Sequence, residues 1–147
     1  MASPFKKVLC AADFDENCAA TIRAARGLLG QDGHLYVFHA VTFPFALTSK
    51  EAEVPLSKAK ERLADIAFPT AGRTNLELIV ESSDNVAKSV LDMARSVSAD
   101  CIVLSTHGRR GVDRLLLGSV AEQVIHGSEI PVLTVRPRST GTCEDAP

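Results

Sequence analysis

The chain has 147 residues, and its 16 lysines and arginines against 18 aspartates and glutamates leave a formal net charge of −2 at pH 7. This length suits one domain with a single core, and the near-neutral charge argues against nucleic acid or an anionic membrane as a partner. No apolar run approaches the roughly 20 residues of a membrane span, and the first residues lead into a strand rather than a signal-peptide core, so we expect a cytoplasmic protein.

Short apolar segments alternate with amphipathic segments of helix length, which is typical of a parallel sheet with helices on both faces. Most of the short segments are continuous apolar runs, as expected for strands that are buried on both sides. We therefore expect an α/β fold with a doubly wound parallel sheet. Its five strands, in chain order, are expected at Lys7–Ala12, His34–Val41, Leu76–Glu81, Cys101–Ser105 and Pro131–Arg136.

Helices are expected in the four intervals between these strands. The first is predicted to follow Asp15 as its N-cap, to carry an apolar stripe from Cys18 to Leu29 and to stop at Gly30. Apolar residues at spacings of three and four predict the next two helices, and a following Gly127 ends the last one. These three helices are expected at Ser57–Ala67, Asn85–Val97 and Ser119–His126.

Two stretches are expected to lack regular structure. Thr42–Pro55 is too long and mixed in composition for a tight connection, so we expect a flexible loop over one end of the sheet. The residues from Arg138 onward are rich in serine, threonine and glycine and acidic at the end, which indicates a disordered tail. The predicted organisation is one domain over residues 1–137 and a tail over 138–147.

A ligand of an open α/β sheet binds outside the carboxyl ends of the strands, where the strand order reverses. The small residues Ala11 and Ala12 close the first strand and leave room for a flat ring or a sugar. Asp13 follows them, and its carboxylate supplies acceptors for an adenine amino group or ribose hydroxyls. In the alternative interpretation Asp13 only caps the following helix, a role for which Asp15 is better placed.

The segment after the fourth strand has features of a phosphate site. Gly108 and Gly118 lack a Cβ, so the backbone can adopt a positive φ and let an anion approach its N–H groups. Ser119 and Glu122 form a capping-box pattern, which predicts a helix that begins at Ser119 and turns its amide end toward the loop. The alternative is that the glycines are ordinary turn residues and Ser119 an ordinary cap.

Three segments together are similar to those of a known family: VLCAADFDENCAATIRAARGL, HLYVFHAV and ADCIVLSTHGRRGVDRLLLGSVAEQVIHGSEIPVLTVRP. On these segments the chain resembles the universal stress protein family over residues 4–137. The third segment is similar to the Gly-x2-Gly-x9-Gly-Ser/Thr signature of the nucleotide-binding members. Ser105 departs from that signature because it stands where the first glycine is expected, so a side chain partly fills the space near the ribose.

The resemblance implies a strand order of 3-2-1-4-5 and a homodimer that pairs through the last strand. It also implies that the ligand is ATP or another adenine nucleotide, with Mg²⁺ on its phosphates. Asp13 and Val41 are implied to contact adenine, with Asp13 also near the ribose. The residues implied to hold the phosphates are Gly108, Gly118 and Ser119, with the backbone of Val120 and Ala121.

We expect a small regulatory module in which hydrolysis is slow or absent, because no paired carboxylates, Walker lysine or activated nucleophile accompany the loop. His107 is interpreted as a hydrogen-bonding residue of this loop and not as a catalyst. The four cysteines form no Cys-x-x-Cys pair, so neither a zinc site nor a disulfide framework is expected.

Three alternatives stay open. The first is a stress or scaffold protein of the same fold that binds no nucleotide, with Ser105 purely structural. The second is an enzyme that hydrolyses ATP. The third is a phosphoacceptor receiver domain, which the pair Asp13 and Asp15 suggests, but Asp84 comes late in the chain and Arg136 stands where that fold needs a lysine.

Overall fold

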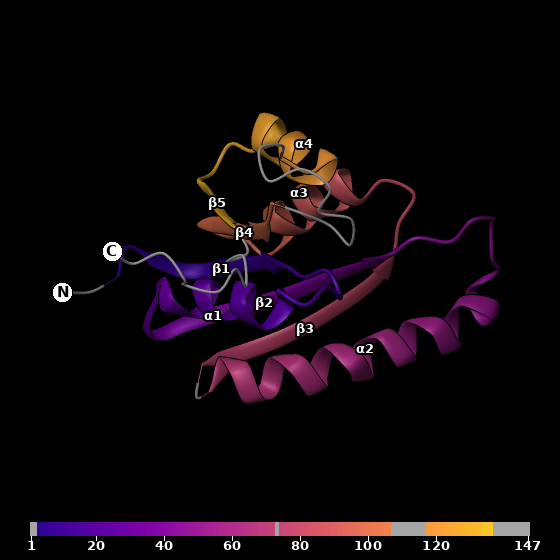
Figure 1. Cartoon of the computed structure of the whole chain (residues 1–147), viewed down its shortest axis with the longest axis horizontal. Coiled ribbons are helices and arrows are strands. Elements are labelled where there is room, and N and C mark those ends of the chain that lie inside the picture. Colours follow the sequence, from indigo (N-terminus) through magenta and orange to yellow (C-terminus); the bar gives the residue numbers. More distant parts are fainter. Residues whose placement is uncertain (1–2, 73, 107–116, 137–147) are drawn as a thin grey trace, which may run out of the picture.

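The computed structural model describes residues 3–72, 74–106 and 117–136. Its centre is a parallel sheet of five strands in the order β3-β2-β1-β4-β5, as expected (Figure 1). The C-terminal tail, His107 and Gly108 lie outside the described residues. The strands are β1 (Phe5–Ala11), β2 (Leu29–Val41), β3 (Asn75–Ser82), β4 (Cys101–Ser105) and β5 (Val132–Val135).

Helices cover both faces of the sheet, α1 and α2 on one side and α3 and α4 on the other (Figure 1). Alternate residues of β1 explain the two layers: Val8 and Cys10 face α1 and α2, whereas Leu9 faces α3 and α4. All three of these side chains are fully buried, so the sheet has a core on each side. The helices are α1 (Cys18–Gly27), α2 (Ser49–Ala71), α3 (Val86–Ser96) and α4 (Ser119–Gly127).

The helix α2 is twice as long as predicted, and the expectation of a loop over Thr42–Pro55 is wrong for its second half, which forms the first turns of the helix. The helix has 23 residues and begins with a capping box, in which the Thr48 hydroxyl accepts from the Glu51 amide and the Glu51 carboxylate accepts from Thr48. Pro55 lies inside the helix. Proline lacks the N–H that a helix interior needs, so this helix forms in spite of Pro55, whereas the loop had been expected from the length and mixed composition of the stretch.

The boundary between α1 and β2 also differs from the prediction. β2 begins at Leu29 and has 13 residues, so Leu29 and Gly30 belong to the strand and not to the end of the helix. Asn17 occupies the N-cap position of α1 in place of Asp15, whose carboxylate instead accepts a hydrogen bond from the Asn17 amide at 3.0 Å. Asp15 therefore orders the turn before the helix.

The strand order reverses at β1, since β2 lies on one side of it and β4 on the other. The chain crosses one face of the sheet between β1 and β2 and the opposite face between β4 and β5, so the loops diverge above β1 and leave a crevice there. Across the described ranges, no helix has both the length and the apolar character to cross a membrane.

Candidate functional site

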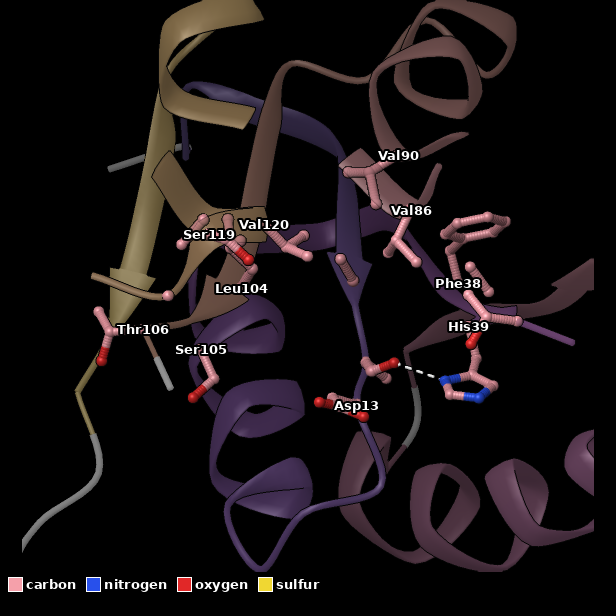
Figure 2. Close-up of a pocket in the computed structure, with 16 residues that line it drawn as sticks. Asp13, Phe38, His39, Val86, Val90, Leu104, Ser105, Thr106, Ser119 and Val120 are labelled. Atoms are coloured by element: carbon pink, nitrogen blue, oxygen red, sulfur yellow. Dashed lines mark hydrogen bonds between the residues drawn. The ribbon is translucent and has the colours of Figure 1, made fainter. Parts of the chain in front are cut away.

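A cavity of about 540 Å³ opens at the carboxyl ends of β1, β2 and β4, where the sequence predicts a site (Figure 2). Ser119 and Val120 lie on one side of it, and Phe38, Val86 and Val90 lie on the other (Figure 2). Of the eleven predicted site residues, eight line this cavity. They are Ala11, Ala12, Asp13, Ser105, Gly118, Ser119, Val120 and Ala121.

The other three predicted residues have different outcomes. His107 and Gly108 lie outside the described residues. Val41 does not line the cavity, although its neighbours Ala40 and Thr42 do. The Val41 carbonyl instead accepts a hydrogen bond from the Ser83 amide at 2.9 Å, which ties the end of β2 to the segment after β3. Successive side chains of a strand point to opposite faces, so a shift of one residue moves the contact from Val41 to Ala40.

The helix α4 begins at Ser119 as predicted, but the cap differs. Gly118 is the N-cap, so Ser119 is the first helical residue and the predicted Ser119–Glu122 capping box is not the cap. The Glu122 amide donates to the Gly118 carbonyl at 3.0 Å, and the Gly118 amide donates to the Thr106 carbonyl at 2.6 Å. The amides of residues 119–121, the first three of the helix, have no acceptor within the helix. They can therefore donate hydrogen bonds to an anion at this end of α4.

Gly118 does not adopt the positive φ that the sequence suggested. Its φ of −60° and ψ of 154° are open to any residue. The backbone conformation therefore does not require glycine. What glycine provides at this position is space, because it lines the cavity without a side chain. A ligand can therefore approach the first turn of α4 closely.

Asp13 lies at the rim of the cavity, and the residues before and after it, Ala12 and Phe14, both contact β2. The Ala12 amide donates to the Phe38 carbonyl at 2.8 Å. The Ala12 carbonyl accepts from Nδ1 of His39, also at 2.8 Å, as the dashed line in Figure 2 shows. The Phe14 ring packs on the His39 ring, with 4.1 Å between their centroids. The Asp13 carboxylate is exposed and available to hydrogen-bond donors of a ligand.

Asp15, two residues further on, is half-buried. Its Oδ1 accepts from the Asn17 amide, whereas its buried Oδ2 has no hydrogen-bond partner among the residues that the structure describes. Burial raises the pKa of this carboxyl above its usual value, and repulsion from Asp13 and Glu16 adds to the rise in pKa. Asp15 does not line the cavity, so the pair Asp13 and Asp15 is not one joint acidic site.

The inner wall of the cavity is apolar, and the sequence did not identify it as part of a site. Val86 and Val90 belong to the apolar pattern that predicts the helix at Asn85–Val97, and periodicity alone cannot tell core residues from residues that line a cavity. They come from the first two turns of α3, so both α3 and α4 direct their amino ends toward the crevice. The five largest apolar side chains that line the cavity, from both of its sides, are together called the apolar wall: Phe38, Val86, Val90, Leu104 and Val120.

The cavity has the properties of a site for a flat apolar ring that carries an anionic group. The apolar wall suits the ring, Asp13 and the serines suit hydroxyl or amino groups, and the start of α4 suits the anion. In the part of the chain that the structure describes, no group of three or more His, Cys, Asp or Glu residues could hold a metal ion.

Comparison with known proteins identifies a family for the chain. A family model described as the Universal stress protein family matches residues 4–136. Universal stress protein A homolog 2 of Coxiella burnetii is 29% identical over 148 residues, which cover 90% of this chain and 95% of that protein.

Two solved structures share the fold. The crystal structure of a universal stress protein in complex with cAMP has a TM-score of 0.67 at 22% identity, covering 90% of this chain and 97% of that one. The structure of the universal stress protein from Archaeoglobus fulgidus in complex with dAMP has a TM-score of 0.58 at 22% identity, covering 87% and 95%. The expected fold and strand order are thus confirmed both by the sheet and by these neighbours.

Proposed function

Because the chain belongs to the universal stress protein family, we propose that its crevice binds an adenine nucleotide, with ATP as the first candidate, and that the protein is a regulatory module of a stress response. Two structural neighbours are complexes with cAMP and dAMP, which supports an adenine nucleotide as the ligand class. The observation that carries the proposal is the cavity itself: an apolar wall, an exposed carboxylate and a free helix amino end meet in one space.

The residues of this chain divide the binding task. The adenine ring would lie against the apolar wall, where Ala11 and Ala40 leave room for it. Asp13 would accept hydrogen bonds from the amino group or from ribose hydroxyls. The first turn of α4, with the Ser119 hydroxyl, would bind a phosphate group through its amides and the helix dipole. With ATP, Mg²⁺ would be held on the phosphates rather than by a cluster of protein ligands.

The proposed module regulates its partners through the binding of the nucleotide and not through its rapid hydrolysis. None of the described residues that line the cavity is a lysine or an arginine, and Asp13 is its only carboxylate, so among these residues no pair of carboxylates can activate a water molecule. Hydrolysis is accordingly proposed to be slow or absent. We also propose a cytoplasmic homodimer that pairs through the exposed edge strand β5.

Isothermal titration calorimetry on protein freed of carried-over ligand tests the proposal. ATP, ADP, AMP and cAMP are titrated in the presence of magnesium, with GTP as the control for the base. We expect saturable binding of at least one adenine nucleotide and weaker binding of GTP. Absence of binding by every adenine nucleotide at millimolar concentration would contradict the proposal.

The second candidate is a scaffold protein of the same fold that binds no nucleotide. The observation that favours it is Ser105, which lines the cavity at the position where the family signature has a glycine. The variant Ser105→Gly separates the two candidates. If the parent protein binds ATP, this variant should bind with equal or higher affinity; if only the variant binds, Ser105 blocks the crevice and the scaffold function is preferred.

A further inference from the structure

The backbone around Asp13 is held on both sides by side chains that do not belong to its own loop. On the preceding side, Nδ1 of His39 donates to the Ala12 carbonyl at 2.8 Å (Figure 2). A carbonyl oxygen only accepts, so Nδ1 carries the hydrogen in this contact. On the following side, the Phe14 ring packs on His39 at a centroid distance of 4.1 Å and an interplanar angle of 36°.

Phe14 also contacts a residue of the helix α2. The guanidinium carbon of Arg62, on α2, lies 4.4 Å from the centroid of the Phe14 ring, a distance typical of a cation–π contact. Phe14 therefore contacts both His39 on β2 and Arg62 on α2. Asp13 is the single residue between Ala12 and Phe14, both of which are held by these contacts.

Asp13 itself has no such anchor. Among the described residues, no hydrogen bond to its carboxylate is seen, and its side chain is exposed at the rim of the cavity. The anchored neighbours therefore set the position of its backbone, from which the side chain reaches the cavity. A ligand that binds an acceptor on an ordered backbone loses less free energy to ordering than one that must first order a mobile loop.

We propose that His39 and Arg62 are positioning residues that order the backbone of Asp13 at the rim of the crevice before the ligand arrives. This inference rests on the proposed function, since it assumes that Asp13 accepts hydrogen bonds from the adenosine part of a nucleotide. Arg62 does not line the cavity, so its effect on binding passes through Phe14. The helix α2 thereby contributes to the ligand affinity of a site that it does not touch.

The first test is a double-mutant cycle in nucleotide binding. Arg62→Ala should weaken binding about threefold to fivefold, as expected for the loss of one exposed cation–π contact. Arg62→Lys should recover part of the loss because it keeps the cation. Arg23→Ala is the matched control, because Arg23 is an exposed arginine on the other helix of the same face.

The cycle is completed in an Asp13→Ala background. If Arg62 acts through Asp13, then Arg62→Ala should cause no further loss of affinity there. An equal loss in both backgrounds would overturn the inference, because Arg62 would then act on the ligand or on the whole fold. His39→Asn serves as the second arm: its amide can still donate to the Ala12 carbonyl, so it should retain more affinity than His39→Leu.

A measurement without ligand decides the inference even if the parent protein binds no nucleotide. Backbone ¹⁵N relaxation of the Asp13 and Phe14 amides reports how rigid this segment is. We expect lower order parameters at both amides in Arg62→Ala and in His39→Leu, and no change in Arg23→Ala. Unchanged order parameters in the first two variants would refute the positioning role. Absent binding by the parent protein would refute only the proposed function.

Discussion

Gly118 combines an ordinary backbone conformation with a position on the cavity wall. Gly118→Val should therefore fold, although valine is a poorer N-cap residue and lowers the free energy of unfolding by about 1 kcal/mol. Its branched side chain would occupy the space in front of the first turn of α4, so we expect nucleotide affinity to fall at least about tenfold, the equivalent of 1.4 kcal/mol. Calorimetric titration measures this loss.

Gly27→Val is the matched control for Gly118→Val. Gly27 ends α1, and a Cβ placed there would meet no atom within 4 Å. The control variant should bind nucleotide like the parent protein, and circular dichroism should show both variants folded. A folded Gly118→Val variant with parental affinity would contradict the role of α4 in phosphate binding.

The half-buried Asp15 predicts an unusual dependence of stability on pH. Its pKa is raised in the folded state, so above pH 3.8 the folded protein retains a proton that the unfolded chain has lost. The contribution of Asp15 to the free energy of unfolding therefore decreases as the pH rises from 3.8 through the folded-state pKa. Asp15→Asn removes the charge and keeps an oxygen that can accept from the Asn17 amide.

Asp15→Asn should consequently be more stable than the parent protein at pH 7, and the difference should shrink below pH 3.8. Urea unfolding at a series of pH values measures both curves. Parallel curves for the two proteins, with a constant difference across the whole range, would show that Asp15 bears no raised pKa.

At the scale of the element, the start of α3 forms part of the crevice and depends on one cap. The Asn85 side chain accepts from the Lys88 amide at 3.1 Å, and Val86 immediately after it lines the cavity. Asn85→Ala should lower the free energy of unfolding by about 1 kcal/mol, whereas Asn85→Asp should restore the cap. Urea unfolding checks the order of stability, and an alanine variant as stable as the parent would show that this cap is dispensable.

The strands other than β2 were predicted to within two residues because their signal is local, whereas α2 was not. Cys101–Ser105 is a continuous apolar run, and the structure confirms the same bounds for β4. In α2 the mixed composition of Thr42–Pro55 favoured a loop, although Thr48 and Glu51 form a capping box at the start of the helix and Pro55 lies inside it. Buried Leu63 and Ala67 anchor the later turns on the sheet, and this tertiary contact outweighs the penalty of proline.

The candidate site was predictable where strand ends and small residues identify it, as with Ala11, Asp13 and Ser119. Two features required the structure. Ala40 and not Val41 lines the cavity, because successive side chains of β2 point to opposite faces of the sheet. A shift of one residue in the assignment changes which of the two is expected at the cavity. The clamp of Arg62 and His39 on the Asp13 segment joins three elements that are far apart in the sequence, so no spacing pattern reveals it.

In the whole molecule, β5 forms one edge of the sheet, and the backbone groups that it directs away from β4 can be identified. The carbonyls of Pro131 and Val135 accept from β4, at 3.0 Å from the Ile102 amide and 3.1 Å from the Thr106 amide. Backbone groups of a strand alternate in direction, so the amide of Thr134 points away from β4 toward the open edge. Leu133 beside it is 39% exposed, so the edge strand also presents an apolar side chain to solvent.

The proposed homodimer through β5 therefore predicts a selective effect of Thr134→Pro. Proline removes one outward N–H without removing a hydrogen bond to β4, and edge strands tolerate it. We expect this variant to sediment as a monomer at micromolar concentration, where the parent protein and Thr134→Ala sediment as dimers, because alanine keeps the N–H. If Thr134→Pro remains fully dimeric, the two protomers do not pair through backbone hydrogen bonds at this edge, and the contact must be sought on another face.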